Sequence, residues 1–200
     1  MYKPAIQAVP ERTVLNSVFV PTAFARVRPG SSVLDLGAGD GVISQAFPRL
    51  RPKIQYTGVD VLPRPADLPA DAVWHQMRIE AWHDWSCEMY DFVIVRNALQ
   101  FLDRRFVLDE LIPDLTRRVP PGGHIALSTF SDPPEPESDL GWRSLYCLRD
   151  FVGLFTSWRT ILSVQEPLVG RTRQDSTMRV WHTVQLIMEH PHHEKPSTSL

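Results

Sequence analysis

A glycine-rich turn that directly follows an apolar segment is the part of the sequence best suited to bind a ligand. Residues 33–41 read Val-Leu-Asp-Leu-Gly-Ala-Gly-Asp-Gly. The glycines at positions 37, 39 and 41 let the backbone turn tightly and let a ligand lie against bare amides at the start of the next helix. Asp35, two residues before the first glycine, supplies a charge that suits a ligand with a cationic end. The pattern predicts a binding site for a nucleotide-like molecule.

A second acidic residue, Asp60, follows the next apolar segment, residues 54–59. An acidic residue at about this distance from a glycine turn binds ribose hydroxyls in doubly wound folds. The glycine spacing differs from that of an NAD site, because the G-x-G-x-x-G pattern requires glycine where this chain has Val42. We therefore expect the glycine turn and Asp60 to share one crevice for a ligand other than NAD.

Four segments in order resemble the motifs of class I S-adenosylmethionine (SAM)-dependent methyltransferases. They read VLDLGAGDG, YTGVD, DFVIVRNALQFL and PPGGHIALSTF, and they span residues 32–130. The remainder of the chain resembles the small-molecule enzymes grouped with tellurite-resistance and ubiquinone-biosynthesis methyltransferases. The resemblance implies an α/β, doubly wound, Rossmann-like sandwich whose seven-stranded, mostly parallel sheet has an antiparallel last strand. It also implies the cofactor S-adenosyl-L-methionine.

The resemblance also implies roles for individual residues. Asp35 and the glycine turn would hold the amino-acid end of SAM, Asp60 the ribose, and residues 96–100 the side that faces the methyl acceptor. The implied cofactor-binding residues are Asp35, Gly37, Ala38, Gly39, Asp40, Asp60, Val61, Ile79, Glu80, Arg96 and Asn97. The candidate substrate residues are Gln100, Trp142 and Tyr146. No catalytic residue is assigned, although Tyr146 or a histidine could accept a proton from the acceptor.

Two departures from the family pattern concern the adenine pocket. Arg78 stands where an acidic residue commonly binds the adenine amino group, and an arginine has no acceptor atom for that bond. Backbone groups near Ile79, or the Glu80 side chain, are the alternatives. Prolines at positions 63, 65 and 69 also occupy the segment where a second helix is usual, so we expect a shortened helix or a loop there.

Other candidates for chemistry are less specific. The His83-Asp84 pair, in an expected loop at residues 82–85, could serve catalysis, but aromatic packing beneath a surface loop explains it better. The histidines of residues 190–193 fit a disordered end better than a metal site. Arg96 cannot ligate a cation, and residues 96–99 lack the Asn/Asp-Pro-Pro-Tyr/Phe run of adenine- and glutamine-directed enzymes. Metal-assisted O-methylation and DNA amino-methylation are therefore disfavoured.

Hydrophobic periodicity predicts the elements that position these residues. We expect residues 1–30 to form an N-terminal arm and helix, residues 31–190 the methyltransferase domain, and residues 191–200 a disordered tail. A helix at 11–27, kinked or split at Pro21, should precede the sheet. A helix capped by Asp103 should be kinked at Pro113. Another should span 142–155, with its apolar residues facing inward: Leu145, Leu148, Phe151, Val152 and Phe155. The expected strands are residues 32–36, 54–59, 72–76, 91–95, 124–130, 158–164 and 180–188, the last two forming an antiparallel hairpin.

Composition narrows the class of protein. The 200 residues include two cysteines, 43% are hydrophobic, and the net charge is −2. The chain shows no long apolar run or signal segment, so we expect a cytoplasmic protein without membrane partners. The net charge argues against strong binding of nucleic acid.

Direct displacement of a methyl group needs alignment of the reactants and exclusion of water rather than a catalytic triad. We therefore expect a methyltransferase acting on a small molecule, with a protein- or RNA-directed enzyme and a non-catalytic methyltransferase-like subunit as alternatives.

Overall fold

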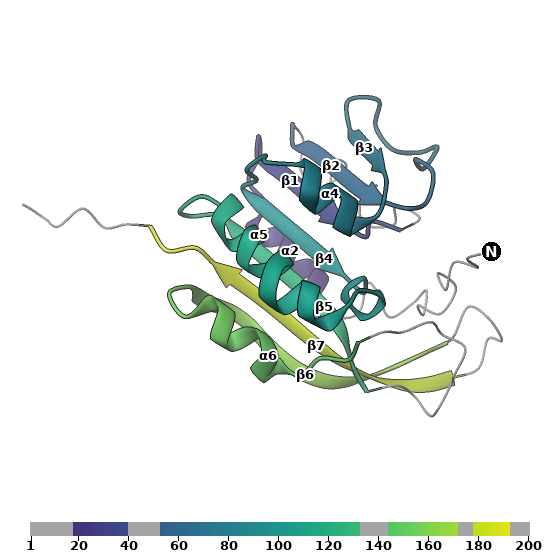
Figure 1. The fold of residues 1–200 in the computed structure, drawn as a ribbon, viewed down its shortest axis with the longest axis vertical. Helices are drawn as coiled ribbons and strands as arrows, with labels where there is room; N and C mark the ends of the chain where they lie inside the picture. The colour runs from purple at the N-terminus through teal and green to yellow at the C-terminus, as the bar shows by residue number, and fades with distance from the viewer. Residues whose placement is uncertain (1–17, 40–52, 133–143, 172–177, 193–200) are drawn as a thin grey trace, which may run out of the picture.

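The computed structural model describes residues 18–39, 53–132, 144–171 and 178–192. Their strands form one seven-stranded sheet with the order β3-β2-β1-β4-β5-β7-β6 (Figure 1). The strands are β1 (Ser32–Leu36), β2 (Gln55–Asp60), β3 (Val73–Gln76), β4 (Phe92–Arg96), β5 (His124–Asp132), β6 (Arg159–Arg171) and β7 (Met178–Glu189). Strands β1 to β5 are parallel, and β7 is antiparallel to both β5 and β6. The predicted fold class is confirmed.

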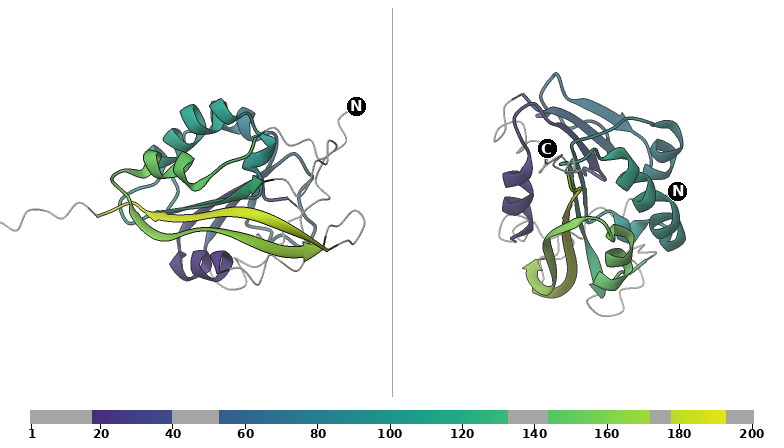
Figure 2. Two further views of the ribbon diagram at one scale, coloured as in Figure 1. Left: turned by 90° about the horizontal axis from the view of Figure 1, so that it is seen from below. Right: turned by 90° about the vertical axis from the view of Figure 1, so that its left-hand side faces the viewer.

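Helices cover both faces of the sheet. The helix α2 (Phe19–Arg26) lies on one face, and α4 (Ile79–Trp85), α5 (Ile112–Arg118) and α6 (Leu148–Val152) lie on the other (Figure 2). Successive side chains of the buried strands point to opposite faces of the sheet and contribute to two apolar clusters, one beneath α2 and one beneath the other three helices. None of the helices in the described ranges is long and apolar enough to cross a membrane.

The predicted helix after β4 begins where the sequence indicates. The Asp103 carboxylate accepts hydrogen bonds from the backbone N–H groups of Arg105 (2.9 Å) and Phe106 (3.2 Å). The turn η2 (Phe106–Leu111) is π-helical and leads into α5, which contains Pro113. The Asp103 cap is therefore confirmed. A widened turn before a proline is consistent with its missing N–H group, and the kink at Pro113 stays a prediction.

Replacing Asp103 with alanine is expected to lower the free energy of unfolding by about 1 kcal/mol, because two backbone N–H groups lose their acceptor. Urea unfolding monitored by circular dichroism measures the change. Asp109→Ala, an exposed carboxylate on the same helical segment, serves as the control and should change stability by less than about 0.5 kcal/mol. Equal losses in the two variants would contradict the capping role.

Three expectations about local structure need correction. Residues 82–85 form the end of helix α4 rather than a loop. Residues 144–147 are not helical, because the Tyr146 N–H donates to the Phe130 carbonyl and Cys147 caps α6 through Asp150. Val152, expected to face inward, is exposed. The predicted residues 142–143 lie outside the described part of the chain.

Three further predictions concern the segment after β2, the first helix and the final hairpin. Residues 61–72 contain no helix, as the prolines predict. Helix α2 begins at Phe19, and Pro21 lies in its first turn, where a missing N–H costs little; it does not kink a longer described helix. The part of the expected helix before residue 18 lies outside the described residues. The final hairpin is confirmed, with β6 continuing past its predicted end to Arg171.

Candidate functional site

The candidate site lies at the carboxyl ends of β1, β2 and β4. In the register of the parallel strands, Asp35 pairs with Gly58 of β2 and with Ile94 of β4. Asp60 and Arg96 are the last residues of their own strands. Since parallel strands end at one edge of the sheet, Asp35, Asp60 and Arg96 come together there, close enough for the charges of Asp60 and Arg96 to act on Asp35. Figure 1 shows this edge of β1, β2 and β4.

The glycine turn folds back onto β2. The backbone N–H groups of Gly37 and Ala38 both donate to the Val59 carbonyl, at 2.8 and 3.2 Å. Gly37 has φ of 73°, and a Cβ atom built on it would stand 2.3 Å from the Cβ of Ala98. Gly39 has φ of 63° with open space around it. Asp40, a predicted cofactor residue, lies outside the described residues.

The Asp60 carboxylate stabilises the glycine turn through a hydrogen bond. One oxygen accepts a hydrogen bond from the Gly39 N–H at 2.8 Å, and the other accepts one from the Leu62 N–H at 2.9 Å. Each carboxylate oxygen has a further lone pair that can accept a ligand hydroxyl. The predicted proximity of Asp60 to the glycine turn is therefore present. Its neighbour Val61 is exposed.

Asp35 is a buried carboxylate held by a tyrosine that sequence analysis did not single out. The Tyr56 hydroxyl donates to the Asp35 carboxylate at 2.8 Å. Burial raises the pKa of Asp35 to about 6, against the opposing effects of the Tyr56 hydrogen bond and the Arg96 charge. Tyr56 lies in the predicted strand that ends at Asp60, but nothing in its spacing indicates a partner 21 residues away.

The residues near the expected adenine position form a short ion pair. Arg78 and Glu80 lie 2.8 Å apart through a guanidinium nitrogen and a carboxylate oxygen. Ile79, between them, is buried and begins helix α4, and its Cδ1 atom would lie 3.7 Å from a Cβ atom built on Gly37. The backbone N–H of Met77 donates to the Asp60 carbonyl, so this segment is tied to the end of β2.

The end of β4 contains an unusual turn at Asn97, which has φ of 51°. Its backbone N–H donates to the Ser128 carbonyl at 2.7 Å, and the Ser128 hydroxyl donates to its side-chain oxygen at 3.1 Å. The Gln100 carboxamide is fully buried, donates to the Asn97 carbonyl at 2.6 Å and accepts from Thr129 at 3.2 Å. Sequence analysis missed Ser128 and Thr129, which only the β4–β5 register brings to this turn.

Tyr146 is buried beside the same turn. Its hydroxyl donates to the Leu99 carbonyl at 3.2 Å, and burial raises its pKa to about 12. A phenol with this pKa is protonated near neutral pH and is poorly suited to act as a base. Trp142, the third candidate substrate residue, lies outside the described residues.

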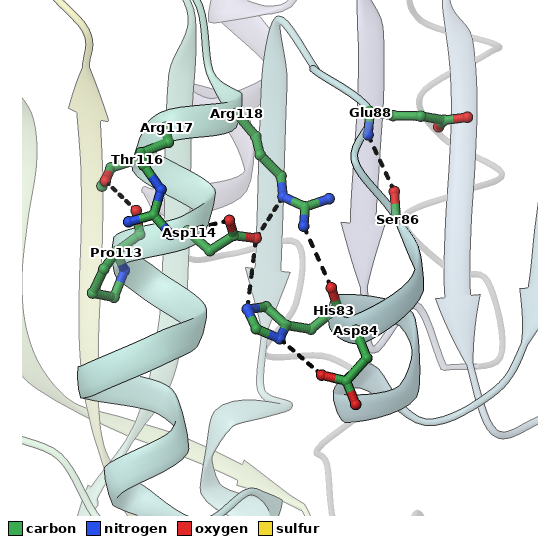
Figure 3. A network of polar contacts seen from close by, with 9 residues as sticks. All are labelled: His83, Asp84, Ser86, Glu88, Pro113, Asp114, Thr116, Arg117 and Arg118. Carbon is green, nitrogen blue, oxygen red and sulfur yellow. Dashed lines mark hydrogen bonds and ion pairs between the residues drawn. The ribbon is translucent and has the colours of Figure 1, made fainter.

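The His83-Asp84 pair belongs to a network that joins α4 to α5 (Figure 3). The His83 ring lies 3.5 Å from the Asp84 carboxylate and 3.6 Å from that of Asp114. Arg118 donates to Asp114 at 2.5 Å and lies over the Trp82 ring at 5.1 Å. These contacts support the packing interpretation of the pair.

His190, expected to lie in a disordered end, is instead ordered, because its backbone N–H and carbonyl form hydrogen bonds with Gly123 and Gly122. The His190 ring stacks on Trp158 with 4.8 Å between ring centroids, and its Nδ1 lies 2.8 Å from the Val119 carbonyl. Within the described ranges, no group of three or more His, Cys, Asp or Glu side chains could hold a metal ion.

A family model described as a methyltransferase domain matches residues 11–166 of this chain. That match covers well over half of the 200 residues. The chain belongs to this methyltransferase family. The predicted family resemblance is thereby confirmed. No curated protein matches the sequence closely enough to name a nearer relative.

Solved structures of other methyltransferases share the fold. TehB from Haemophilus influenzae has a TM-score of 0.71 at 17% identity over 85% of this chain, which spans only 60% of the TehB chain. The N-methyltransferase NodS from Bradyrhizobium japonicum, in complex with S-adenosyl-L-homocysteine (SAH), has a TM-score of 0.65 at 15% identity, covering 94% of this chain and 95% of NodS. The 1,6-didemethyltoxoflavin-N1-methyltransferase from Burkholderia thailandensis has a TM-score of 0.58 at 14% identity, and the match covers 90% of this chain and 82% of that enzyme.

Proposed function

We propose that this methyltransferase binds SAM at the carboxyl edge of β1, β2 and β4 and transfers its methyl group to a small molecule. The observation that carries the proposal is the Asp60 carboxylate, bound to the Gly39 N–H beside a tightly folded glycine turn. Asp35 stands on the adjacent strand, where a negative charge suits the ammonium group of an amino acid. These two carboxylate acceptors thus fit a ligand with an amino-acid end and a ribose.

The chain's own residues would work mainly by binding and orientation. When bound, SAM supplies a methyl carbon activated by a positively charged sulfur. Asp60 would accept the ribose hydroxyls, and Ile79 would pack near the adenine, with Glu80 or a backbone group as its polar partner. Asn97 and Arg96 would line the side facing the acceptor, where the Gln100 and Ser128 hydrogen bonds hold the turn rigid. Such positioning supports a direct displacement without a strong acid or base.

The acceptor class is supported by two observations. NodS and the didemethyltoxoflavin enzyme, which share this fold, are an N-methyltransferase and an N1-methyltransferase. The net charge of −2 disfavours a nucleic-acid substrate. The domain that performs the reaction is proposed to be residues 31–190, with residues 1–30 as an arm that contributes to the site; the family match begins within that arm.

Asp60→Ala is expected to weaken SAM binding about tenfold or more, since it removes a charged hydrogen-bond acceptor. Calorimetric titration with SAM and SAH measures the effect. Asp67→Ala, an exposed carboxylate in the following loop, is the control and should leave both affinities unchanged. Absence of SAM binding to the unmodified chain would refute the proposed function, and unchanged binding by the Asp60 variant would refute the assigned role.

A further inference from the structure

The sheet face beneath α2 changes from apolar to polar toward the carboxyl ends of the parallel strands. The part farther from those ends is apolar, with Phe92, Ala126 and Ile187 in the cluster that contacts α2. Two residues further along the same face, Ala126 is followed by Ser128 and Ile187 is preceded by Gln185, and these two residues pair in the sheet. Polar side chains thus replace apolar ones on neighbouring strands at the edge where the candidate site lies.

The polar group continues across β7 to β6. The Gln185 amide nitrogen donates to the Glu166 carboxylate at 3.2 Å and to the Thr183 hydroxyl at 3.3 Å. The Thr183 hydroxyl in turn donates to the Glu166 carbonyl at 3.3 Å. A carboxylate only accepts hydrogen bonds, so the contact with Glu166 fixes the orientation of the Gln185 amide.

This orientation leaves the Gln185 oxygen without a donor and the Glu166 carboxylate with lone pairs beyond the one that accepts from Gln185. The Gln185 side-chain oxygen is buried and has no hydrogen-bond partner, although the residue is only 2% exposed. None of the ion pairs between side chains that the structure describes includes Glu166, which remains partly exposed. A buried carbonyl without a donor is unfavourable, so the arrangement is best satisfied by a ligand that brings N–H groups.

We propose that Glu166 and Gln185 form a subsite that binds an amine group of the methyl acceptor. The inference rests on the proposed function and narrows its substrate class to molecules carrying a protonated amine. The Gln185 oxygen would accept one N–H and the Glu166 carboxylate another, with the opposite charge adding to the attraction. Strand β7 lies two strands from β4, so the amine binds about 10 Å from the end of β4, and one acceptor can reach both places.

The test uses three small probes of one shape: phenethylamine, 2-phenylethanol and phenylacetate. Their binding to the full chain saturated with SAH is measured by ligand-observed NMR. Phenethylamine is expected to bind at least about tenfold more tightly than the alcohol, and phenylacetate to be excluded by the Glu166 charge.

Two variants link this preference to the subsite. Glu166→Gln keeps the shape and a hydrogen bond to Gln185 but removes the charge, so the amine should bind about tenfold more weakly and the alcohol unchanged. Glu110→Gln, the same change at an exposed position on the helix after β4, should alter neither. Gln185→Leu should also lose amine binding, with thermal unfolding and SAH affinity reporting whether the fold and cofactor site are intact.

The outcomes separate this inference from the proposed function. Equal binding of amine and alcohol, no amine binding by a chain that binds SAH, or an amine affinity unaffected by Glu166→Gln would each overturn the subsite and leave the SAM assignment standing. Failure of SAH to bind would overturn both.

Discussion

Gly37→Ala is expected to destabilise the chain by about 3 kcal/mol and to abolish SAM binding. The added methyl group would stand 2.3 Å from the Ala98 Cβ, and φ at this residue is 73°. A left-handed conformation costs a non-glycine residue about 1 kcal/mol, and overpacking adds about 1–3 kcal/mol. Relief of the clash requires the glycine turn to move away from the end of β4, which would displace the backbone that faces the cofactor. Denaturant unfolding and calorimetric titration measure the two effects.

Two comparison variants separate strain from crowding. Gly30→Ala has a similar φ of 85° with nothing within 4 Å, so it should cost only about 1 kcal/mol and leave SAM affinity unchanged. Adding Ala98→Gly to the Gly37 variant removes the opposing methyl group and should restore part of the lost stability. If Gly37→Ala lowers the free energy of unfolding no more than Gly30→Ala and the variant still binds SAM, the close approach of Gly37 to Ala98 does not require glycine in the turn.

The sheet and the outline of the site could be predicted because their signals are local. The strand β1 matches its prediction at both ends, since an apolar run ending in a glycine turn has few alternative structures. Asp60 could be placed near Gly39 because parallel strands joined in sequence end at the same edge. The order of motifs then indicated the family, which the family model confirms.

Contacts between distant strands could not be predicted from the sequence. Tyr56 and Asp35 meet across the β1–β2 pair, and Ser128 reaches Asn97 through the β4–β5 register. Neither pair has a spacing that indicates a partner. Gln100 was expected to face the acceptor, but in the short 3-10 turn it lies inside and braces Asn97, because one polar residue in an irregular segment has no periodicity to set its direction.

Helix α4 illustrates a different limit. The Trp-His-Asp-Trp segment at residues 82–85, expected to be a loop, forms the end of this helix. In the structure Trp82 is fully buried and Trp85 exposed, and the helix is stabilised by contacts of His83 and Trp82 with α5. Tertiary packing therefore outweighs the weak local preference of this segment.

Asp35→Asn is expected to stabilise the ligand-free chain at pH 8 while weakening SAM binding. The pKa of Asp35 is raised from 3.8 to about 6, chiefly by burial. Between these values the folded chain binds more protons than the unfolded chain, so the free energy of unfolding falls as the pH rises through this window. Above pH 6 the ionised carboxylate lowers stability by up to about 3 kcal/mol, and an asparagine removes that effect. The side-chain oxygen of asparagine can still accept the Tyr56 hydroxyl.

The pH dependence distinguishes this explanation from a general gain in packing. Urea unfolding at pH 4 should show little difference between Asp35→Asn and the unmodified chain, whereas the full stabilisation should be present at pH 8. Asp71→Asn, an exposed carboxylate, should show no such trend. A stabilisation equal at both pH values would contradict the role of buried charge. The opposite signs expected for stability and SAM affinity follow from one cause, since the charge that burial disfavours in the free chain is offset when a cationic amino group binds beside it.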